Sequence, residues 1–203
     1  MPSTLRTLVK LNGAGQATVI VVEQRRIHAL GHHVTGVQLI LLAAPLNSGH
    51  SYWSLVKDSG WLGHVRSVLH TSVCIVDYVV AGQGVLVHCS DGWDRTAQTC
   101  SLAGFMLDPF YRTLRGFATL VEKEWLAFGH KFSQRNGLVK DKAKEVSPIF
   151  LQFLEAAWHL SKQFPRAFEF NERLLIALHD CLHSCQFGTF LGNNERERKV
   201  RVS

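Results

Sequence analysis

Residues 85–96 read Val85-Leu86-Val87-His88-Cys89-Ser90-Asp91-Gly92-Trp93-Asp94-Arg95-Thr96. The apolar start predicts a short, fully buried strand, and the residues after Arg95 predict a helix. A strand, a tight loop and a helix together form an anion-binding cup, because the loop N–H groups and the positive end of the helix dipole converge on one point. This order also puts the loop at the carboxyl end of a central strand, where open α/β sheets bind ligands.

The residues of this loop predict covalent hydrolysis of a phosphate ester. Cys89 lies where a thiolate is favoured, and the thiolate is the nucleophile. Arg95 can hold two phosphate oxygens with its planar guanidinium. The thiolate would attack phosphorus to give a phosphocysteine, which water then hydrolyses. Thr96 is expected to hold the sulfur as thiolate, and His88 to orient the loop by hydrogen bonds.

The rest of the loop is expected to bind the phosphate through its backbone N–H groups and the Arg95 side chain. These expected substrate-binding residues are Ser90, Asp91, Gly92, Trp93, Asp94 and Arg95. The alternative is that the loop has no catalytic role, and that a buried cysteine lies beside an arginine by chance.

A leaving alkoxide needs a proton, and two carboxylic acids lie inside the loop. Asp94, next to the arginine, is the preferred general acid. Asp91 could instead face substrate hydroxyls, and the spacing alone does not separate the two. Either aspartate could also simply cap the helix that follows.

A second basic cluster follows one helix later, at residues 130–135. Lys131 and Arg135 are four apart, so a helical turn there would point both side chains the same way. A substrate with further phosphates would need such cations beside the cup. A solvated surface pair is the alternative.

The composition favours one ordinary soluble domain. The chain has 203 residues, 46% hydrophobic and 19% charged, which is enough to bury one core. A net charge of +6 would suit an acidic ligand or an anionic membrane surface, but is equally typical of solvated faces. No nucleic-acid partner is expected. The apolar run 37–46 is too short to cross a bilayer.

The cysteines favour a reducing, cytosolic compartment, because they are five in number, lack a repeating spacing and follow no secretory signal. Those outside the cup are expected to be buried thiols: Cys74, Cys100, Cys181 and Cys185. A metal site at Cys181 and Cys185 with nearby histidines lacks a second ligand cluster, so we expect neither a metal nor a cofactor. His28, His32 and His33 are interpreted as surface histidines.

The pattern along the chain predicts an α/β protein with a largely helical second half. Strands are expected at 18–22 and 85–87, and residues 37–42 fit a strand or a buried helix. Helices are expected from 59 to the glycines at 82 and 84, then at 96–107, 111–128, 148–163 and 171–185. Ser147 is expected to cap the fourth of these, with Pro148 at its first position. Residues 130–147 are predicted to be a loop, and the charged end 194–201 a frayed terminus.

The sequence Cys-Ser-Asp-Gly-Trp-Asp-Arg-Thr at 89–96 resembles the active-site loop of the myotubularin phosphatases, a branch of the cysteine-dependent tyrosine phosphatase superfamily. Further resemblance lies in Leu107-Asp-Pro-Phe-Tyr-Arg-Thr113, Gly129-His-Lys-Phe-Ser-Gln-Arg135 and Phe168-Glu-Phe-Asn-Glu172. The second of these, with Glu-Val-Ser-Pro at 145–148, most resembles the subgroup of myotubularin-related proteins six, seven and eight.

The resemblance implies a cysteine-dependent phosphatase fold with a partial central sheet. It also implies a metal-independent phosphoinositide 3-phosphatase acting on phosphatidylinositol 3-phosphate and phosphatidylinositol 3,5-bisphosphate. Carried over by position, Cys89 is the nucleophile, Asp94 the acid, and Lys131 and Arg135 hold the inositol head group. The family implies a cytoplasmic protein, peripheral on endosomal membranes, that forms homo- or hetero-oligomers with relatives.

Resemblance covers about residues 51–197, which predicts a divergent segment at 1–50, a partial phosphatase domain at 51–197 and a charged tail at 198–203. Family members carry a membrane-binding domain and a longer first half of the catalytic domain, which residues 1–50 do not resemble. Two alternatives therefore stand beside the lipid phosphatase. One is an inactive fragment that binds and modulates full-length relatives, and the other is a protein dual-specificity phosphatase.

Overall fold

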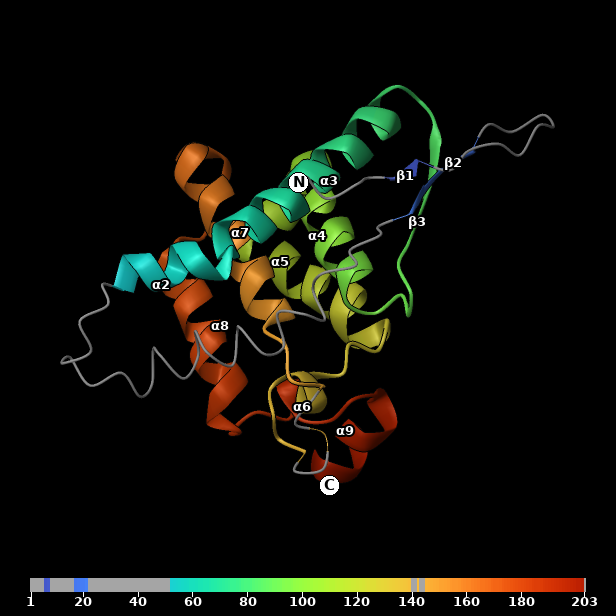
Figure 1. The fold of residues 1–203 in the computed structure, drawn as a ribbon. Coiled ribbons are helices and arrows are strands. Elements are labelled where there is room, and N and C mark those ends of the chain that lie inside the picture. Colours follow the sequence, from blue (N-terminus) through green and yellow to red (C-terminus); the bar gives the residue numbers. More distant parts are fainter. Residues whose placement is uncertain (1–5, 8–16, 22–51, 140–141, 143–144, 203) are drawn as a thin grey trace.

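The computed structural model describes residues 6–7, 17–21, 52–139, 142 and 145–202. The expectations for residues 28–46 lie outside these residues. Within them the chain is mainly helical, with one small sheet at its edge (Figure 1). No described helix is both long enough and apolar enough to span a membrane.

The sheet has three strands in the order β1-β2-β3. β1 (Arg6–Thr7) pairs antiparallel with β2 (Ala17–Val21), which pairs parallel with β3 (Gly84–His88) from Ala17 opposite Gly84 to Val21 opposite His88. The strands expected at 18–22 and 85–87 are therefore present.

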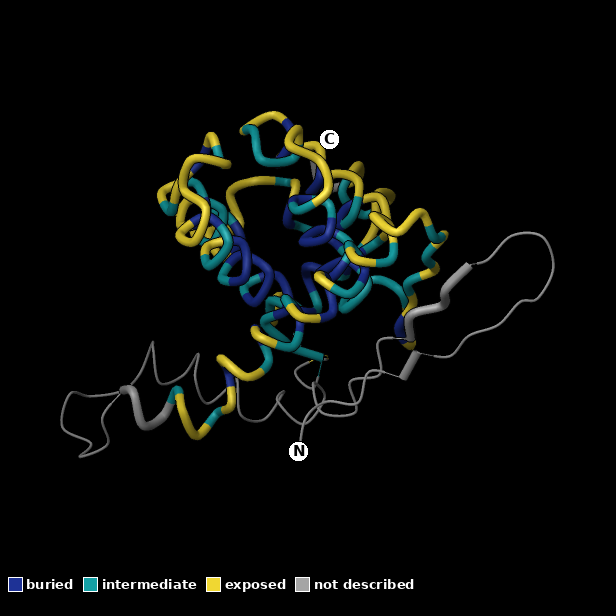
Figure 2. The backbone as a smooth tube through the Cα atoms, turned by 90° about the horizontal axis from the view of Figure 1, so that it is seen from above, coloured by how far each residue is buried: buried dark blue, intermediate teal, exposed yellow. Residues whose placement is uncertain are grey.

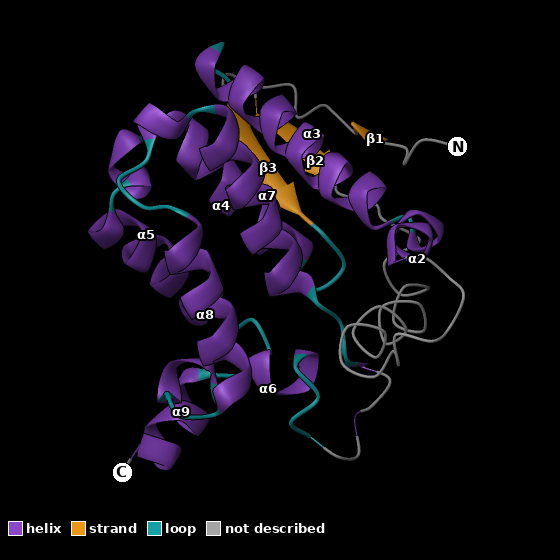
Figure 3. Ribbon diagram, turned by 90° about the vertical axis from the view of Figure 1, so that its left-hand side faces the viewer, coloured by secondary structure: helices purple, strands orange, loops and turns teal. Residues whose placement is uncertain are grey.

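The expectation that the strand before Cys89 is central and fully buried is wrong for the described sheet. β3 lies at its edge, and Leu86 is 57% exposed. Val85 and Val87 are only partly buried, where they pack against Ile75 and Ala103. The helices they meet, α3 (Trp61–Val80) and α4 (Arg95–Leu107), lie alongside β3 in Figure 3. Side chains on one face of the strand are thus covered and those on the other are not.

α3 follows α2 (Tyr52–Ser59) after Gly60, which has a positive φ of 68°. The face of α3 with Trp61, Val65 and Val68 is buried, as its three- and four-residue spacing predicts. α3 ends beside Gly82, whose φ is 74°. α4 ends at Leu107 before Asp108 and Pro109, also as expected.

The single helix expected at 111–128 is wrong. A 3₁₀ turn over Pro109–Arg112 comes first, then α5 (Leu114–Val121), then a π-helical turn over Glu122–Ala127. Thr113 begins α5, because its hydroxyl accepts a hydrogen bond from the Gly116 N–H at 2.9 Å. A left-handed glycine, Gly129 with φ 78°, follows the π turn as expected.

The stretch expected to be a loop at 130–147 contains a short helix, α6 (Phe132–Arg135). α7 (Ile149–Gln163) begins after Pro148, and the Ser147 side chain does not cap it; instead the Ser147 carbonyl accepts from the Ile149 N–H at 2.9 Å. α8 (Glu172–Ser184) is capped by Asn171, whose side chain accepts from the Arg173 N–H. Short 3₁₀ turns at Pro165–Ala167 and Gly188–Phe190 flank α8.

The expectation of a frayed charged terminus is wrong, because residues Glu195–Val202 form α9. Asn194 caps it by accepting from the Glu197 N–H at 2.9 Å. Arg198 Nη2 donates to the Leu126 carbonyl at 2.9 Å, which joins α9 to the π turn. A charged helix is thus held in place by hydrogen bonds between Glu197 and the two asparagines before the helix, and by the long-range bond of Arg198.

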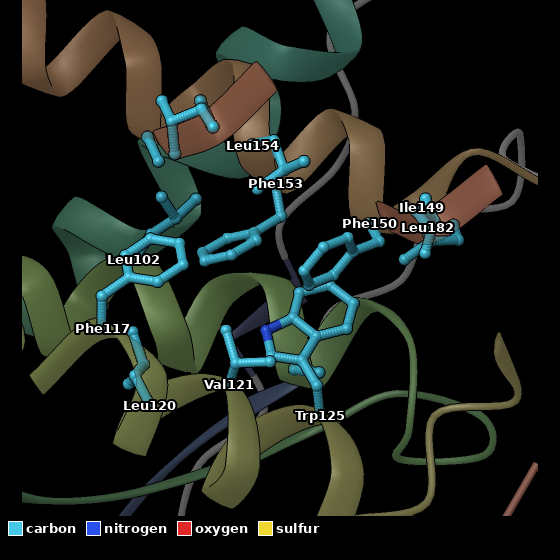
Figure 4. Close-up of a cluster of buried hydrophobic side chains, with 14 of the residues drawn as sticks. Leu102, Phe117, Leu120, Val121, Trp125, Ile149, Phe150, Phe153, Leu154 and Leu182 are labelled. Carbon is cyan, nitrogen blue, oxygen red and sulfur yellow. The ribbon is translucent and has the colours of Figure 1, made fainter. Parts of the chain in front are cut away.

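The core lies among α3, α4, α5, α7 and α8, where Figure 2 shows the buried backbone gathered. Its centre is aromatic (Figure 4): Trp125 meets Phe150 edge-to-face, with ring centroids 4.8 Å apart, and Phe153 at 5.0 Å. The Trp125 indole N–H, fully buried, donates to the Ser101 hydroxyl at 2.9 Å. Because a buried indole N–H needs a partner, this bond fixes the π turn against α4.

Candidate functional site

The candidate site is the loop between β3 and α4, residues 89–94, called the Cys89 loop below. Cys89 leaves the end of β3 and is only 8% exposed. Gly92 adopts a φ of 83°, a left-handed conformation that costs other residues free energy. This turn directs the Gly92 N–H at the Cys89 sulfur, 3.2 Å away. The loop therefore folds back over its own cysteine.

The environment of Cys89 lowers the pKa of its thiol. Burial alone raises this pKa, but hydrogen bonds from the Thr96 side chain and backbone and from the Gly92 and Asp91 N–H groups lower it by more. The Thr96 hydroxyl has no other hydrogen-bond partner among the described residues, although it is buried. It is therefore available to the sulfur.

Arg95 begins α4 and turns back toward the loop. Its Nη2 donates to the Ser90 hydroxyl at 2.8 Å, and that hydroxyl donates to an Asp91 carboxylate oxygen at 3.2 Å. His88 Nδ1 lies 3.4 Å from the carbonyl oxygen of Cys89. Arg95, Ser90 and Asp91 thus form one polar chain across the loop.

Asp94, the preferred general acid, is paired with Arg135. Its Oδ2 accepts from Arg135 Nη2 at 2.8 Å and from Nε at 3.1 Å. Burial raises the pKa of Asp94, but the hydrogen bonds and charges of His130 and Arg135 lower it by more. The pKa therefore lies below its ordinary value, and the group is a carboxylate. Asp94 does not cap α4 through its side chain, so the capping alternative does not apply to it. Asp91, in contrast, is exposed.

His130 lies against the Cys89 loop and contacts two of its residues. It was not predicted as a site residue. Its ring is 1% exposed, and Nδ1 lies 3.0 Å from the Trp93 carbonyl and 2.9 Å from Asp94 Oδ1. One N–H cannot point well at both oxygens, and the carbonyl has the better hydrogen-bond geometry, so the carboxylate contact is electrostatic. The only sequence signal was its place in the basic cluster.

Lys131 and Arg135 both lie over the Trp93 ring, as the helical turn at α6 allows. Lys131 Nζ is 4.6 Å and Arg135 Cζ 4.5 Å from the ring centroid. These are cation–π distances. The structure therefore brings the basic pair to the Cys89 loop, with Trp93 as the point of contact.

The two cations differ in how far their charge is compensated. Arg135 is 5% exposed and pairs with Glu145 at 3.0 Å as well as with Asp94. Lys131 forms no ion pair within the part of the chain that the structure describes. Glu145 was not predicted in any site role, and no pattern in the sequence pairs it with Arg135.

Gln98 fixes α4 behind the loop. Its side chain is fully buried, and Nε2 donates to the Ile149 carbonyl at 2.8 Å and to Gln152 Oε1 at 3.1 Å. These bonds join the first turn of α4 to the first turn of α7. A polar residue on the apolar face of a predicted helix was the signal that could have marked it.

The described residues contain no cluster of three or more potential metal ligands. His179 and His183 of α8 have ring centroids 4.9 Å apart, and Cys185 nearby is exposed. Cys74, Cys100 and Cys181 are partly buried free thiols, so the expectation of burial fits them better than it fits Cys185.

Comparison with known proteins matches residues 10–199 to the myotubularin-like phosphatase domain. The phosphatidylinositol-3,5-bisphosphate 3-phosphatase MTMR6 of Rattus norvegicus is 54% identical over 153 residues, covering 75% of this chain and 23% of the relative.

Two human proteins are similar to the same degree. Phosphatidylinositol-3,5-bisphosphate 3-phosphatase MTMR8 of Homo sapiens is 54% identical over 149 residues, covering 73% of this chain and 21% of the relative. Phosphatidylinositol-3-phosphate phosphatase MTMR7 of Homo sapiens is 53% identical over 148 residues, covering 72% and 22%. The chain thus spans about a quarter of the length of these relatives. With its family domain matched over residues 10–199, this chain belongs to the myotubularin-like phosphatase family.

Proposed function

We propose that this chain removes the 3-phosphate from phosphatidylinositol 3-phosphate and phosphatidylinositol 3,5-bisphosphate through a phosphocysteine intermediate. The observation that carries the proposal is the Cys89 thiol, buried in a loop whose N–H groups and Thr96 lower its pKa. The similar relatives MTMR6 and MTMR7 are named as phosphatases of these two lipids.

The reaction has two balanced steps. The Cys89 thiolate attacks phosphorus, the bond from phosphorus to the inositol oxygen breaks, and that oxygen leaves with a proton. Water then attacks the phosphocysteine, the aspartate that donated its proton in the first step takes up the proton of the water, and the sulfur leaves as a thiolate that Thr96 stabilises. The N–H groups of residues 90–95 and the Arg95 guanidinium stabilise the charge on the phosphate oxygens in both steps.

The proton donor is one of the two aspartates in the loop. The resemblance favours Asp94, but its carboxylate is charged while Arg135 holds it, so it can donate a proton only after that pairing loosens. Asp91 is exposed, beside Ser90, without such a constraint. Both aspartates stay candidates for the proton donor.

The inositol ring would lie against Trp93 and Lys131. Lys131 is the described cation over Trp93 whose charge has no carboxylate partner, so it is the better placed of the basic pair to meet a head-group anion.

The proposal includes the cysteine-dependent phosphatase fold, the domain division at residues 50 and 197, and peripheral attachment to endosomal membranes from the cytoplasm. It also includes homo- or hetero-oligomers with relatives.

Phosphate release from short-chain phosphatidylinositol 3-phosphate, comparing the intact chain with Cys89→Ser, tests the proposal. We expect release from the intact chain alone. Equal phosphate release by the intact chain and by Cys89→Ser would contradict the proposed enzymatic function. Release from phosphotyrosine peptides but not from the lipid would favour a protein phosphatase instead.

A second candidate is a non-catalytic fragment that binds full-length relatives. The observation that favours it is that β3 lies at the edge of the described sheet, with Leu86 57% exposed. Binding to a full-length relative, with no Cys89-dependent release, would support this candidate.

A further inference from the structure

Arg135 is held by two carboxylates that differ in their surroundings. Asp94 is 15% exposed and accepts hydrogen bonds from Nε and Nη2, whereas Glu145 is 45% exposed and pairs with Nη1. Burial decides how firmly each is held. A buried charge that loses its partner is strongly destabilising, while an exposed ion pair contributes little. An incoming anion would therefore displace Glu145 and leave Asp94 in place.

The backbone keeps Arg135 in position during such an exchange. Its Nη1 also donates to the Glu145 carbonyl, and its own carbonyl accepts from the Ser147 N–H at 3.0 Å. Only the Glu145 side chain has to move, and it is partly in solvent already. The guanidinium would stay stacked over Trp93, 4.5 Å from the ring centroid.

We propose that Glu145 is a specificity-determining residue, whose carboxylate occupies the Nη1 side of Arg135 and competes there with a second phosphate of the substrate. The inference rests on the proposed function, because it assumes that an inositol phosphate enters the Cys89 loop. The first phosphate is bound by the loop and Arg95, so Glu145 opposes only the additional one. Glu145 thereby lowers the affinity for a bisphosphate head group more than for a monophosphate one.

The two cations over Trp93 support this assignment, because their charges are compensated to different degrees. Among the described residues Lys131 has no carboxylate partner, and its Nζ lies 4.6 Å from the ring, so one cation is already available to a head group. Arg135 becomes available only when Glu145 withdraws. The site thus offers Lys131 to a head group at all times, and Arg135 only when the Glu145 carboxylate moves away from it.

The experiment measures lipid binding to the full chain carrying Cys89→Ser, so that no turnover occurs. Short-chain phosphatidylinositol 3-phosphate and 3,5-bisphosphate, both below their micelle concentrations, are titrated calorimetrically. We expect Glu145→Gln to tighten bisphosphate binding about two- to five-fold, the range for an exposed ion pair, and to leave monophosphate binding unchanged.

Two further variants isolate the cause. Glu145→Asp keeps the charge but shortens the side chain, and we expect it to act in the same direction as Glu145→Gln. Glu172→Gln removes an equal charge from an exposed pair with Lys162 and is expected to leave the ratio of the two affinities unchanged. Thermal unfolding of each variant checks that the fold is kept.

The outcomes separate this inference from the proposed function. An unchanged affinity ratio in Glu145→Gln, or the same change in Glu172→Gln, overturns the role of Glu145 alone. A changed ratio with no Cys89-dependent phosphate release in the intact chain overturns the enzymatic function alone. Binding of neither lipid overturns both.

Discussion

Asp94 accepts two hydrogen bonds from Arg135, at 2.8 and 3.1 Å, and so joins the Cys89 loop to a helix that begins 38 residues later at Phe132 (132 − 94). Both side chains are nearly inaccessible to solvent. The pair therefore fixes the position of the Cys89 loop relative to α6, and it helps to keep the Asp94 carboxylate ionised. The first two predictions follow from this contact.

Replacing Asp94 by asparagine should destabilise the protein by up to about 3–5 kcal/mol, because it leaves the buried Arg135 charge with only the half-exposed Glu145 carboxylate as partner. Urea unfolding measures the change. The control is Asp180→Asn, which removes a 73%-exposed carboxylate paired only with His179 and should change stability by less than about 0.5 kcal/mol. Unchanged stability, with activity lost on alkyl phosphates but kept on aryl phosphates with good leaving groups, would instead identify Asp94 as the proton donor.

The stability contributed by Asp94 should depend on pH with a definite sign. Its pKa in the folded chain lies below the ordinary value of 3.8, so the unfolded chain takes up the proton more readily. The contribution is complete above the ordinary pKa and is lost as the pH falls toward the lowered one. The stability difference between the parent and Asp94→Asn should thus narrow as the pH is lowered from about 6 to about 3. A constant difference would show that the carboxylate is not responsible.

Replacing Thr96 by valine should raise the pKa of the Cys89 thiol, because the hydroxyl that helps to lower it is removed while the side-chain shape is kept. The rate of alkylation by iodoacetamide against pH measures this pKa, and its midpoint should move upward. Thr119→Val, a change on the exposed side of α5, is the control. A midpoint that stays in place would remove Thr96 from the stabilisation of the thiolate.

Alkylation should also distinguish Cys89 from Cys100. Burial, with a smaller effect of Glu124, raises the pKa of Cys100 to about 12, so its thiolate is scarce near neutral pH. Mass spectrometry of the peptides after brief labelling at about pH 7 should find Cys89 modified and Cys100 intact. Equal labelling of the two would mean that the loop does not activate Cys89.

Gly116 in the first turn of α5 should not tolerate alanine. A Cβ there would lie 1.7 Å from the Phe110 carbonyl oxygen, so the 3₁₀ turn before α5 would have to move. We expect a loss of about 1–3 kcal/mol in the free energy of unfolding. Gly63→Ala is the matched control, because its Cβ meets no atom within 4 Å. Gly63 lies in the first turn of α3, where alanine is the better helix former, so the substitution should stabilise the protein by at most about 1 kcal/mol. Equal effects of the two substitutions would contradict the close contact at Gly116.

The sequence predicted those parts of the fold that local pattern and short-range chemistry determine. The extents of α4, α7 and α8 follow from apolar spacing and from signals such as Pro148 before α7. The Cys89 loop was predicted because a strand end, a glycine turn and a helix start are all encoded within twelve residues. Contacts such as Thr96 with the thiol belong to the same short range.

What the sequence could not predict depends on contacts between distant segments. The π turn at Glu122–Ala127 is held by the bond of Trp125 to Ser101 and the bond of its Leu126 carbonyl to Arg198, 72 residues away. The bond from Arg198 to the Leu126 carbonyl also holds the charged end of the chain in place as α9. Likewise His130 and Arg135 together lower the pKa of Asp94 and keep it ionised, which no spacing within the loop indicates.

Trp93 makes the site observable without a label. Its indole lies within cation–π distance of Lys131 and Arg135, and its carbonyl meets His130. Trp61 and Trp125, in contrast, lie in the core, away from solvent. An anion that draws Lys131 from the ring would change the field at Trp93, so anion binding there should change the intrinsic fluorescence of this chain, over the background of other tryptophans such as the 37%-exposed Trp158.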